Sequence, residues 1–264
     1  MILLSVFLMV SLSACSQTEK LSDPNTYPTQ NSVESSPAPT EPETLENEND
    51  ANGGEEAMAT HDPAKEAKLF YLGHASFRIE TAEGKVIYID PYAGEDYSKP
   101  ADLVLVTHYH SDHYALNKIT KNEGCKVIES SEALKGGKYQ SFEVFGIKIK
   151  AVPAYNKNHK KSECVGYVLE FNGIKLYHAG DTSKIDEMAD LKAEELDYAL
   201  LPMDDVYNMG PEEAAECAEI IQAKQVIPIH TGPNGVFSEE NIAKFNATGK
   251  LVVKPGESIS LSNQ

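Results

Sequence analysis

Residues 107–113 read Thr107-His108-Tyr109-His110-Ser111-Asp112-His113, directly after the apolar run Leu103–Val106. In an extended segment, residues i and i+2 face the same side, so His108 and His110 can bind one metal ion together. Asp112 and His113 follow where the chain turns and can reach a second ion beside the first. Imidazole nitrogens and carboxylate oxygens suit zinc, and also iron or manganese. Because a random polar loop seldom holds three histidines and an aspartate in six residues, the stretch predicts a metal site.

The sequence around this stretch predicts an α/β domain with two layers of sheet. Short apolar runs bounded by turn residues predict strands, at Leu69–Glu80, Lys85–Asp90, Leu103–His108, Lys126–Ser130, Ser141–Pro153, Val165–His178, Tyr198–Met203, Val226–His230 and Leu251–Val253. Asn172-Gly173 between alternating apolar runs predicts a hairpin. Proline at the first position, two glutamates and helical apolar spacing predict a helix from Pro211 to about Lys224. Weaker helices are expected from an N-cap at Ser238 and after His113.

Thr-His-x-His-x-Asp-His after a strand resembles the signature of the metallo-β-lactamase superfamily. Four further stretches match, Leu72–Phe77, Ile89–Tyr92, Tyr177–Thr182 and Ile227–His230. They resemble the branch that holds the ascorbate-phosphate lactonases, the phospholipase D acting on N-acylethanolamine lipids, and many uncharacterised metal-dependent hydrolases. The resemblance covers about residues 68–261. It implies a metallo-β-lactamase-like αββα sandwich of two mixed β-sheets with outer helices, and a site at one edge where strand ends converge.

The resemblance also implies the remaining metal ligands. Asp181 matches the carboxylate that bridges both metals, although an aspartate there could equally be an N-cap. His230 matches the third ligand of the second metal. The third ligand of the first metal is expected in the loop after the strand that ends at Val152. His159 is the candidate and Asn156 the runner-up, while a His159 merely solvated among neighbouring lysines is the alternative.

Three further residues are expected to support the site or the substrate. Asp90 resembles a carboxylate that accepts an N–H from a ligating histidine and fixes its tautomer. His74 resembles a histidine close to the site that could bind substrate. Tyr207 belongs to the loop 204–209, which follows a strand end and is expected to line the pocket.

Two other expectations concern neighbouring positions. Asp204 and Asp205 in that loop would disfavour an anionic substrate or recognise a cationic one. His178 lies three residues before Asp181, so on a strand it points to the opposite face. We expect His178 to be a buried, hydrogen-bonded core histidine.

Two metal ions about 3.5–4 Å apart can hold a bridging hydroxide and polarise a substrate oxygen. The sequence therefore predicts a hydrolase with two divalent metal ions, zinc first, with manganese or iron as alternatives. Asp112 and Asp181 are the expected catalytic carboxylates. The expected substrate is an ester, lactone or phosphodiester of a small molecule or of a lipid or cell-envelope component. No Gly-x-Ser-x-Gly is present. The alternative is a metal-loaded surface binding lipoprotein without turnover.

The chain's first 66 residues differ in composition from the rest. Residues 1–15 form a short apolar run ending in Leu12-Ser13-Ala14-Cys15, which resembles a lipoprotein signal peptide and lipobox, although no Lys or Arg precedes the run. The resemblance implies lipidation of Cys15 and a protein anchored to the cell membrane, facing outside the cytoplasm. Residues 16–66 hold twelve acidic residues and two lysines and predict a disordered tether. Residues 67–264 are the predicted hydrolase domain.

Charge and cysteine content narrow the function classes further. The formal net charge of −18 over 264 residues argues against binding to nucleic acid, whose phosphates an acidic surface repels. It does not exclude a small phosphorylated substrate held by metals. Cys125, Cys164 and Cys217 are widely spaced and form no Cys-x-x-Cys pair, so we expect small core residues rather than a zinc ribbon or disulfides. The oligomeric state is left open.

Overall fold

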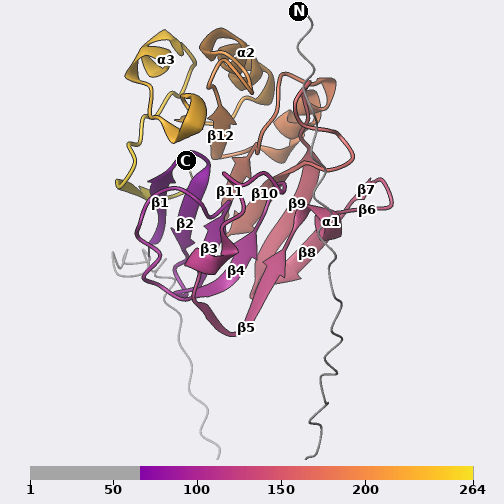
Figure 1. Cartoon of the computed structure of the whole chain (residues 1–264), viewed down its shortest axis with the longest axis vertical. Helices are drawn as coiled ribbons and strands as arrows, with labels where there is room; N and C mark the ends of the chain where they lie inside the picture. Colours follow the sequence, from indigo (N-terminus) through magenta and orange to yellow (C-terminus); the bar gives the residue numbers. More distant parts are fainter. Residues whose placement is uncertain (1–65, 264) are drawn as a thin grey trace, which may run out of the picture. The chain divides into compact units, whose positions relative to one another are not determined.

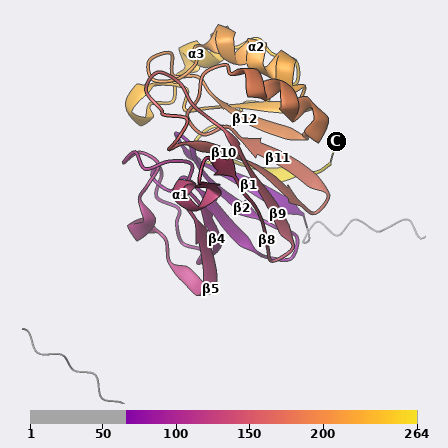
Figure 2. The same cartoon turned by 90° about the vertical axis from the view of Figure 1, so that its right-hand side faces the viewer.

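The computed structural model describes residues 66–263. The signal peptide, Cys15 and residues 16–65 of the predicted tether lie outside these described residues. Two six-stranded sheets make up the described part (Figures 1 and 2). The first sheet contains, in spatial order, β14 (Ser258–Leu261), β1 (Ala67–Gly73), β2 (Ser76–Glu80), β3 (Val86–Ile89), β4 (Ala101–Leu105) and β5 (Lys121–Ile128). The second contains β13 (Gln225–Ile229), β12 (Tyr198–Pro202), β11 (Ile174–His178), β10 (Val165–Phe171), β9 (Ile147–Pro153) and β8 (Ser141–Val144).

Both sheets are mixed in the same way. β14, β1, β2 and β3 pair antiparallel, whereas β3, β4 and β5 pair parallel. In the second sheet β8 to β11 pair antiparallel, and β11, β12 and β13 pair parallel. Parallel strands end at the same edge of a sheet, so the residues that follow β3, β4, β11, β12 and β13 can meet there. The predicted fold of two mixed sheets is confirmed.

Three apolar clusters hold the layers together. The largest lies between the sheets and is built from inward-facing residues such as Leu69, Ile149 and Tyr167. The outer face of the second sheet is covered by α2 (Pro211–Ile221) and the 3-10 helix Asp186–Glu194. The outer face of the first sheet is covered mainly by loops and the short 3-10 helix Leu116–Lys118. The helix expected after His113 is therefore only this short turn.

Other elements depart from the sequence prediction at specific places. Leu251–Val253 is not a strand, because only an isolated bridge joins Lys250 to Val226. The strand β14 was missed, since its serines break up the apolar run on which the prediction rested. The helix α2 ends at Ile221 rather than near Lys224. The helix α3 (Glu239–Lys244) begins as predicted, with Ser238 accepting the backbone N–H of Asn241.

The remaining elements are small. A four-residue helix, α1 (Ser130–Ala133), precedes the two-stranded ribbon of β6 (Leu134–Lys135) and β7 (Lys138–Tyr139), and a 3-10 turn spans Pro233–Gly235. The predicted hairpin at Asn172-Gly173 is present, with both residues at positive φ. In the described part of the chain, no helix is long and apolar enough to cross a bilayer.

The three described cysteines are free. Cys164 and Cys217 are buried, as expected of small core residues. Cys125 is only half-buried at the edge of the outer cluster on the first sheet, because β5 is the edge strand there. The expectation that it is a core residue was wrong.

Candidate metal centre

Potential metal ligands from distant parts of the chain converge at the edge where the parallel strands end. Among the described residues, three overlapping sets have ligand atoms within 4.8 Å of one another: His108, His110 and His159; His108, His113 and Asp181; and His74, Asp112, His113 and His230. These sets contain every residue that the sequence predicts as a ligand. They also contain His74, which the sequence placed close to the site.

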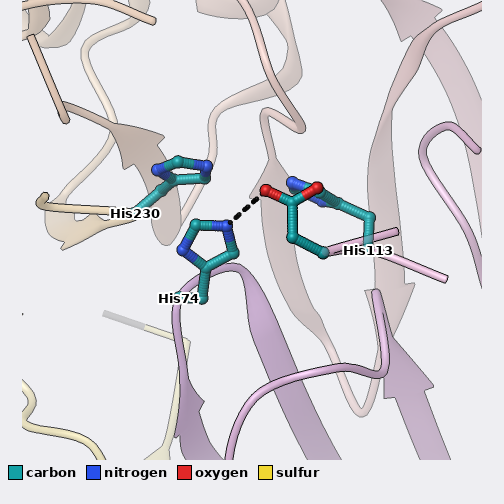
Figure 3. Close-up of side chains that lie close together, drawn as sticks. His74, His113 and His230 are labelled. Atoms are coloured by element: carbon teal, nitrogen blue, oxygen red, sulfur yellow. Dashed lines mark hydrogen bonds and ion pairs between the residues drawn. The ribbon is translucent and has the colours of Figure 1, made fainter. Parts of the chain in front are cut away.

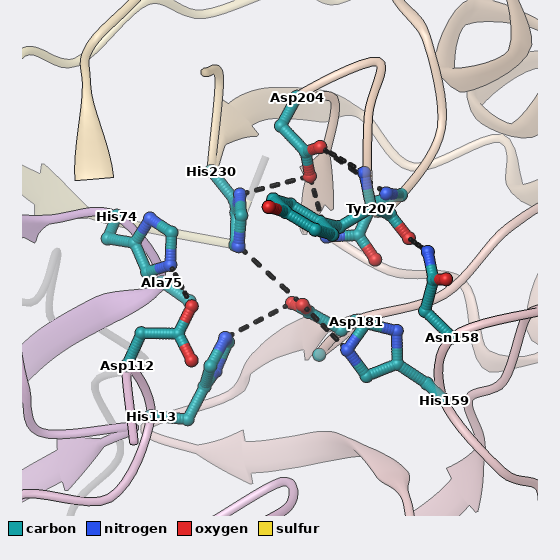
Figure 4. A network of polar contacts seen from close by, with 12 residues as sticks. His74, Ala75, Asp112, His113, Asn158, His159, Asp181, Asp204, Tyr207 and His230 are labelled. Atoms are coloured by element: carbon teal, nitrogen blue, oxygen red, sulfur yellow. Dashed lines mark hydrogen bonds and ion pairs between the residues drawn. The ribbon is translucent and has the colours of Figure 1, made fainter. Parts of the chain in front are cut away.

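Asp181 lies at the centre of this cluster, after β11. Its Oδ2 is 3.2 Å from His159 Nε2 and 3.5 Å from His230 Nε2, and its Oδ1 is 3.3 Å from His113 Nε2 (Figure 4). The carboxylate is buried, so burial alone would raise its pKa. The attraction of His113 and His230, with the close contacts of His113 and His159, reverses this and holds the pKa of Asp181 well below its ordinary value. A carboxylate ionised at this position can contact several cations or imidazoles at once.

His159, not Asn156, reaches the centre from the loop after β9. The His159 side chain is only 3% exposed, which excludes a merely solvated residue. Its Nδ1 lies 2.9 Å from Asn156 Oδ1, and that oxygen also accepts the His159 backbone N–H at 3.0 Å. Asn156 therefore orients the His159 ring, although the sequence made Asn156 the alternative metal ligand at this position. Sequence reasoning missed this role because both residues carry groups that can bind metal.

Two residues orient His108 and His113 in the same manner. Asp90 accepts the Thr107 hydroxyl at 2.6 Å and lies 2.8 Å from His113 Nδ1. Because the Thr107 hydroxyl donates to Asp90, it must accept from His108 Nδ1, which lies 3.0 Å away. Both Nδ1 atoms then carry the proton, and both Nε2 atoms keep a lone pair for the centre. The contact predicted between Asp90 and a histidine is present.

Asp204 lies against the outer nitrogen of His230, and the sequence interpretation of Asp204 was wrong. Its Oδ2 lies 3.1 Å from His230 Nδ1, and the carboxylate is buried. Its Oδ1 accepts the backbone N–H groups of Val206 at 2.8 Å and Tyr207 at 2.6 Å. Both oxygens are thus engaged within the protein, so Asp204 does not face a substrate. Its position just after β12 mirrors that of Asp90 after β3, which is the signal that could have revealed it.

His74 occupies the turn between β1 and β2 and completes the inner wall. Its ring lies beside that of His230 with centroids 3.6 Å apart, and its Nε2 is 3.1 Å from Asp112 Oδ2 (Figure 3). Its carbonyl accepts the backbone N–H of His230 at 2.8 Å, which ties the two sheets together here. Burial lowers the pKa of His74, although the hydrogen bond to Asp112 opposes this, so the ring is neutral at pH 7. His74 therefore positions Asp112 and is itself a potential ligand.

Three residues at the centre have left-handed backbones without being glycine. The φ angles are 56° at His74, 45° at Asp90 and 44° at His230. Each such conformation costs on the order of 1–3 kcal/mol and tends to persist at functional sites. The concentration of this strain in a layer of histidines and aspartates supports a functional role for the layer.

Comparisons with known proteins decide the family. Residues 68–230 match the β-lactamase superfamily domain. A UPF0173 metal-dependent hydrolase of Thermococcus onnurineus is 34% identical over 224 residues, which are 74% of this chain and 99% of that protein. Another, of Pyrococcus furiosus, is 34% identical over 226 residues with the same coverage of both chains. This chain is a member of the metal-dependent hydrolases of the β-lactamase superfamily.

A solved structure agrees with this assignment. Igni18, a metallo hydrolase from the hyperthermophilic archaeon Ignicoccus hospitalis, is 25% identical and superposes with a TM-score of 0.60. The match covers 75% of this chain and 99% of that one. This hydrolase is therefore an enzyme that depends on metal. The binding protein without turnover finds no support in these relatives.

The residues of this hydrolase fit a metal on the structure's own evidence. His108 Nε2, His113 Nε2 and Asp181 Oδ1 are buried and make no hydrogen bond. Buried polar atoms are rarely left in this state unless something absent from the protein chain engages them. Burial, and then the charge of His113, lowers the pKa of His108 to about 3, so its Nε2 lone pair is free at neutral pH. All three residues belong to one ligand set.

A cavity of about 560 Å³ opens onto the ligand cluster of the hydrolase. His110, Asp112, His159 and His230 line it, and so does Tyr207, as the sequence predicted for this loop. The Asp112 side chain is 39% exposed, which makes it the most accessible carboxylate of the centre. Substrate can therefore approach from the side of Asp112.

His178 lies outside the cluster, as expected. Its ring is buried, with Nε2 2.9 Å from the carbonyl of Ala75 and Nδ1 accepting the backbone N–H of Gly180 at 3.1 Å. Both ring nitrogens are engaged by backbone groups, so His178 fixes the start of the Asp181 loop rather than binding metal.

Proposed function

We propose that this metal-dependent hydrolase binds two divalent ions, zinc in the first instance, and cleaves an ester, lactone or phosphodiester bond. The observation that carries the proposal is the ring of histidines around Asp181. His108, His113 and His159 have Nδ1 in hydrogen-bond contact with an outer partner, and His230 Nδ1 lies 3.1 Å from the Asp204 carboxylate. Such outer partners fix the tautomer and raise the basicity of metal ligands.

The ligands would divide into two groups, each with members that contact Asp181. His108, His110 and His159 would hold one ion, and Asp112, His113 and His230 the other, with Asp181 between them. Two ions bound there would provide Lewis acidity and a nucleophilic water at neutral pH.

Asp112 would orient the nucleophilic water, and His74 would hold Asp112 in place. Burial would raise the pKa of Asp112, but the hydrogen bond with His74 and the charge of His113 outweigh it and lower the pKa, so Asp112 stays ionised at neutral pH. Its exposed position allows it to accept a hydrogen bond from a water in the cavity and orient that water. The buried Asp181 has no such access and would hold the ions in place.

The test is turnover on a neutral ester, a lactone and a phosphodiester by full-length protein loaded with zinc. We expect hydrolysis of at least one, and a loss of orders of magnitude in Asp181→Ala. Asp102→Asn is the matched control, because Asp102 is a buried carboxylate in β4 that accepts the backbone N–H of Val86 and contacts no member of the cluster. A metal-replete wild type that hydrolyses none of the three would contradict the proposal.

We also propose that the chain is anchored to the membrane through lipid on Cys15 and acts outside the cytoplasm on a small molecule, lipid or envelope component. The lipobox-like Leu12-Ser13-Ala14-Cys15 and the acidic stretch behind it support this. Cys15→Ser should leave the precursor uncleaved or move the protein to the soluble fraction. Unchanged membrane fractionation and processing would argue against lipidation.

A further inference from the structure

The loop that follows β12 presents an exposed aromatic ring in the wall of the cavity. Tyr207 is 46% exposed, so its ring is accessible to a ligand. It lines the same cavity as Asp112, His159 and His230. Figure 4 shows Tyr207 beside His230 and near Asp181. We propose that Tyr207 forms a subsite that binds a flat apolar group of an ester or lactone substrate, next to the bond that is cleaved.

The backbone of Tyr207 is fixed on both sides, so the ring is carried by a rigid support. Its N–H donates to Asp204 Oδ1 at 2.6 Å. Its carbonyl accepts from Asn156 Nδ2 at 3.0 Å and from Asn158 Nδ2 at 2.9 Å. A binding surface whose backbone is already ordered loses less entropy when it binds a ligand.

The same partners tie this support to the metal centre. Asp204 also contacts His230 Nδ1 at 3.1 Å, and Asn156 also contacts His159 Nδ1 at 2.9 Å. The position of the Tyr207 ring is thus set relative to one expected ligand of each ion. A group bound against the ring lies at a defined place beside the reacting bond, as a specificity subsite requires.

The wall of the cavity indicates the chemistry of the group. Besides the histidines and Asp112, it is lined by two aromatic rings, Tyr92 and Tyr207, and by the neutral side chains of Ser111, Asn158 and Asn234. Aromatic rings recognise flat apolar groups through their faces and edges. The Asp112 carboxylate, which also lines the cavity, would repel an anionic substituent. A neutral ester or lactone with an aromatic or flat apolar substituent fits this wall.

The subsite rests on the proposed hydrolysis, and the experiment separates the two. Methyl acetate and methyl phenylacetate differ only in the phenyl group, and acid release measures their hydrolysis by full-length, zinc-loaded protein. We expect Tyr207→Ala to lower kcat/KM for methyl phenylacetate about tenfold and for methyl acetate less than about twofold. A tenfold change equals about 1.4 kcal/mol, a size that burial of one ring face can provide. Tyr207→Phe should keep the wild-type ratio between the two esters.

Val206→Ala is the matched control, because Val206 is the exposed neighbour of Tyr207 in the loop but does not line the cavity. Calorimetry gives a readout without turnover: the affinity for phenylacetate should fall about tenfold in Tyr207→Ala while that for acetate stays. If Tyr207→Ala unfolds, Tyr207→Leu keeps apolar volume and tests the loss of the flat face. Equal losses for both esters, or an unchanged ratio, overturn the subsite. A wild type inactive on both esters contradicts the ester proposal, and calorimetry then decides the subsite alone.

Discussion

Replacement of Asp90 by asparagine tests whether outer partners set the metal affinity of this hydrolase. Three donors converge on the buried Asp90 carboxylate: the Thr107 N–H at 2.8 Å, the Thr107 hydroxyl at 2.6 Å and His113 Nδ1 at 2.8 Å. Asparagine offers only one oxygen. If that oxygen meets the Thr107 N–H, the new NH₂ faces His113 Nδ1, which must then accept. The His113 proton moves to Nε2, and the lone pair directed at the centre is lost.

The opposite amide orientation is also unfavourable. It places the NH₂ against the Thr107 N–H and leaves a buried donor unsatisfied, at about 1–3 kcal/mol of stability. Loss of an outer partner typically lowers metal affinity roughly 10–100-fold. We therefore expect Asp90→Asn to bind zinc that much more weakly in competition with a chromogenic chelator. Urea unfolding in chelator should show a stability loss of about 1–3 kcal/mol.

The control for this prediction is again Asp102→Asn. The Asp102 carboxylate accepts the Val86 N–H at 2.9 Å and lies 3.2 Å from Lys85 Nζ, in the same sheet as Asp90 but away from the cluster. The Asp102→Asn protein should lose stability without losing zinc affinity. A folded Asp90→Asn protein with wild-type zinc affinity would refute the reasoning.

The remaining predictions concern single ligands and protonation. His159→Ala should lower the affinity for one of two zinc ions by more than Asn156→Ala does, because Asn156 only orients the ring; chelator titration would refute this if the order were reversed. Without metal, stability should fall as the pH drops from about 6.5 towards 3, because the unfolded chain then binds a proton on His108 that the folded chain does not. Burial would lower the pKa of His113, but the charges of Asp181 and Asp90 outweigh it and raise the pKa. The folded chain therefore binds this proton more tightly than the unfolded chain, so the resulting stabilisation is complete below about pH 6.5 and declines above it. The urea midpoint of chelator-treated protein should thus peak near pH 6.5, and a flat profile from pH 4 to 8 would contradict both assignments.

The parts of the site that follow from local geometry could be predicted from the sequence. The segment 107–113 follows a buried strand, so its spacing alone places His108 and His110 together. Resemblance to the superfamily then located Asp181 and His230, which lie 68 and 117 residues beyond His113. Most continuous apolar runs form strands, although Leu251–Val253 does not. Strands were missed or misplaced where burial depends on a neighbouring strand, as in β14, whose Ile259 packs against the core from an otherwise polar segment.

The outer partners could not be predicted in the same way. Asn156 and Asp204 carry groups that bind metal or substrate as readily as they accept an N–H from histidine. Which task each performs depends on the tertiary position of the adjoining ring, and no periodicity encodes that position. Asp90 was recognised only because the resemblance supplied its role. The sequence therefore predicts ligand types better than it predicts which polar residue holds which ligand.

One chain of contacts explains why the roles of Asn156 and Asp204 could not be predicted one residue at a time. His159 contacts Asn156, whose Nδ2 lies 3.1 Å from Asn208 Oδ1. Asn208 Nδ2 in turn donates to Asp204 Oδ2 at 2.8 Å, and that oxygen lies 3.1 Å from His230 Nδ1. The ligands expected to complete the two metal groups are thus oriented by one loop, although 71 positions separate them in the sequence. Because neither end of this chain can shift without changing the hydrogen bonds of the other, the loop positions both ligands as a unit.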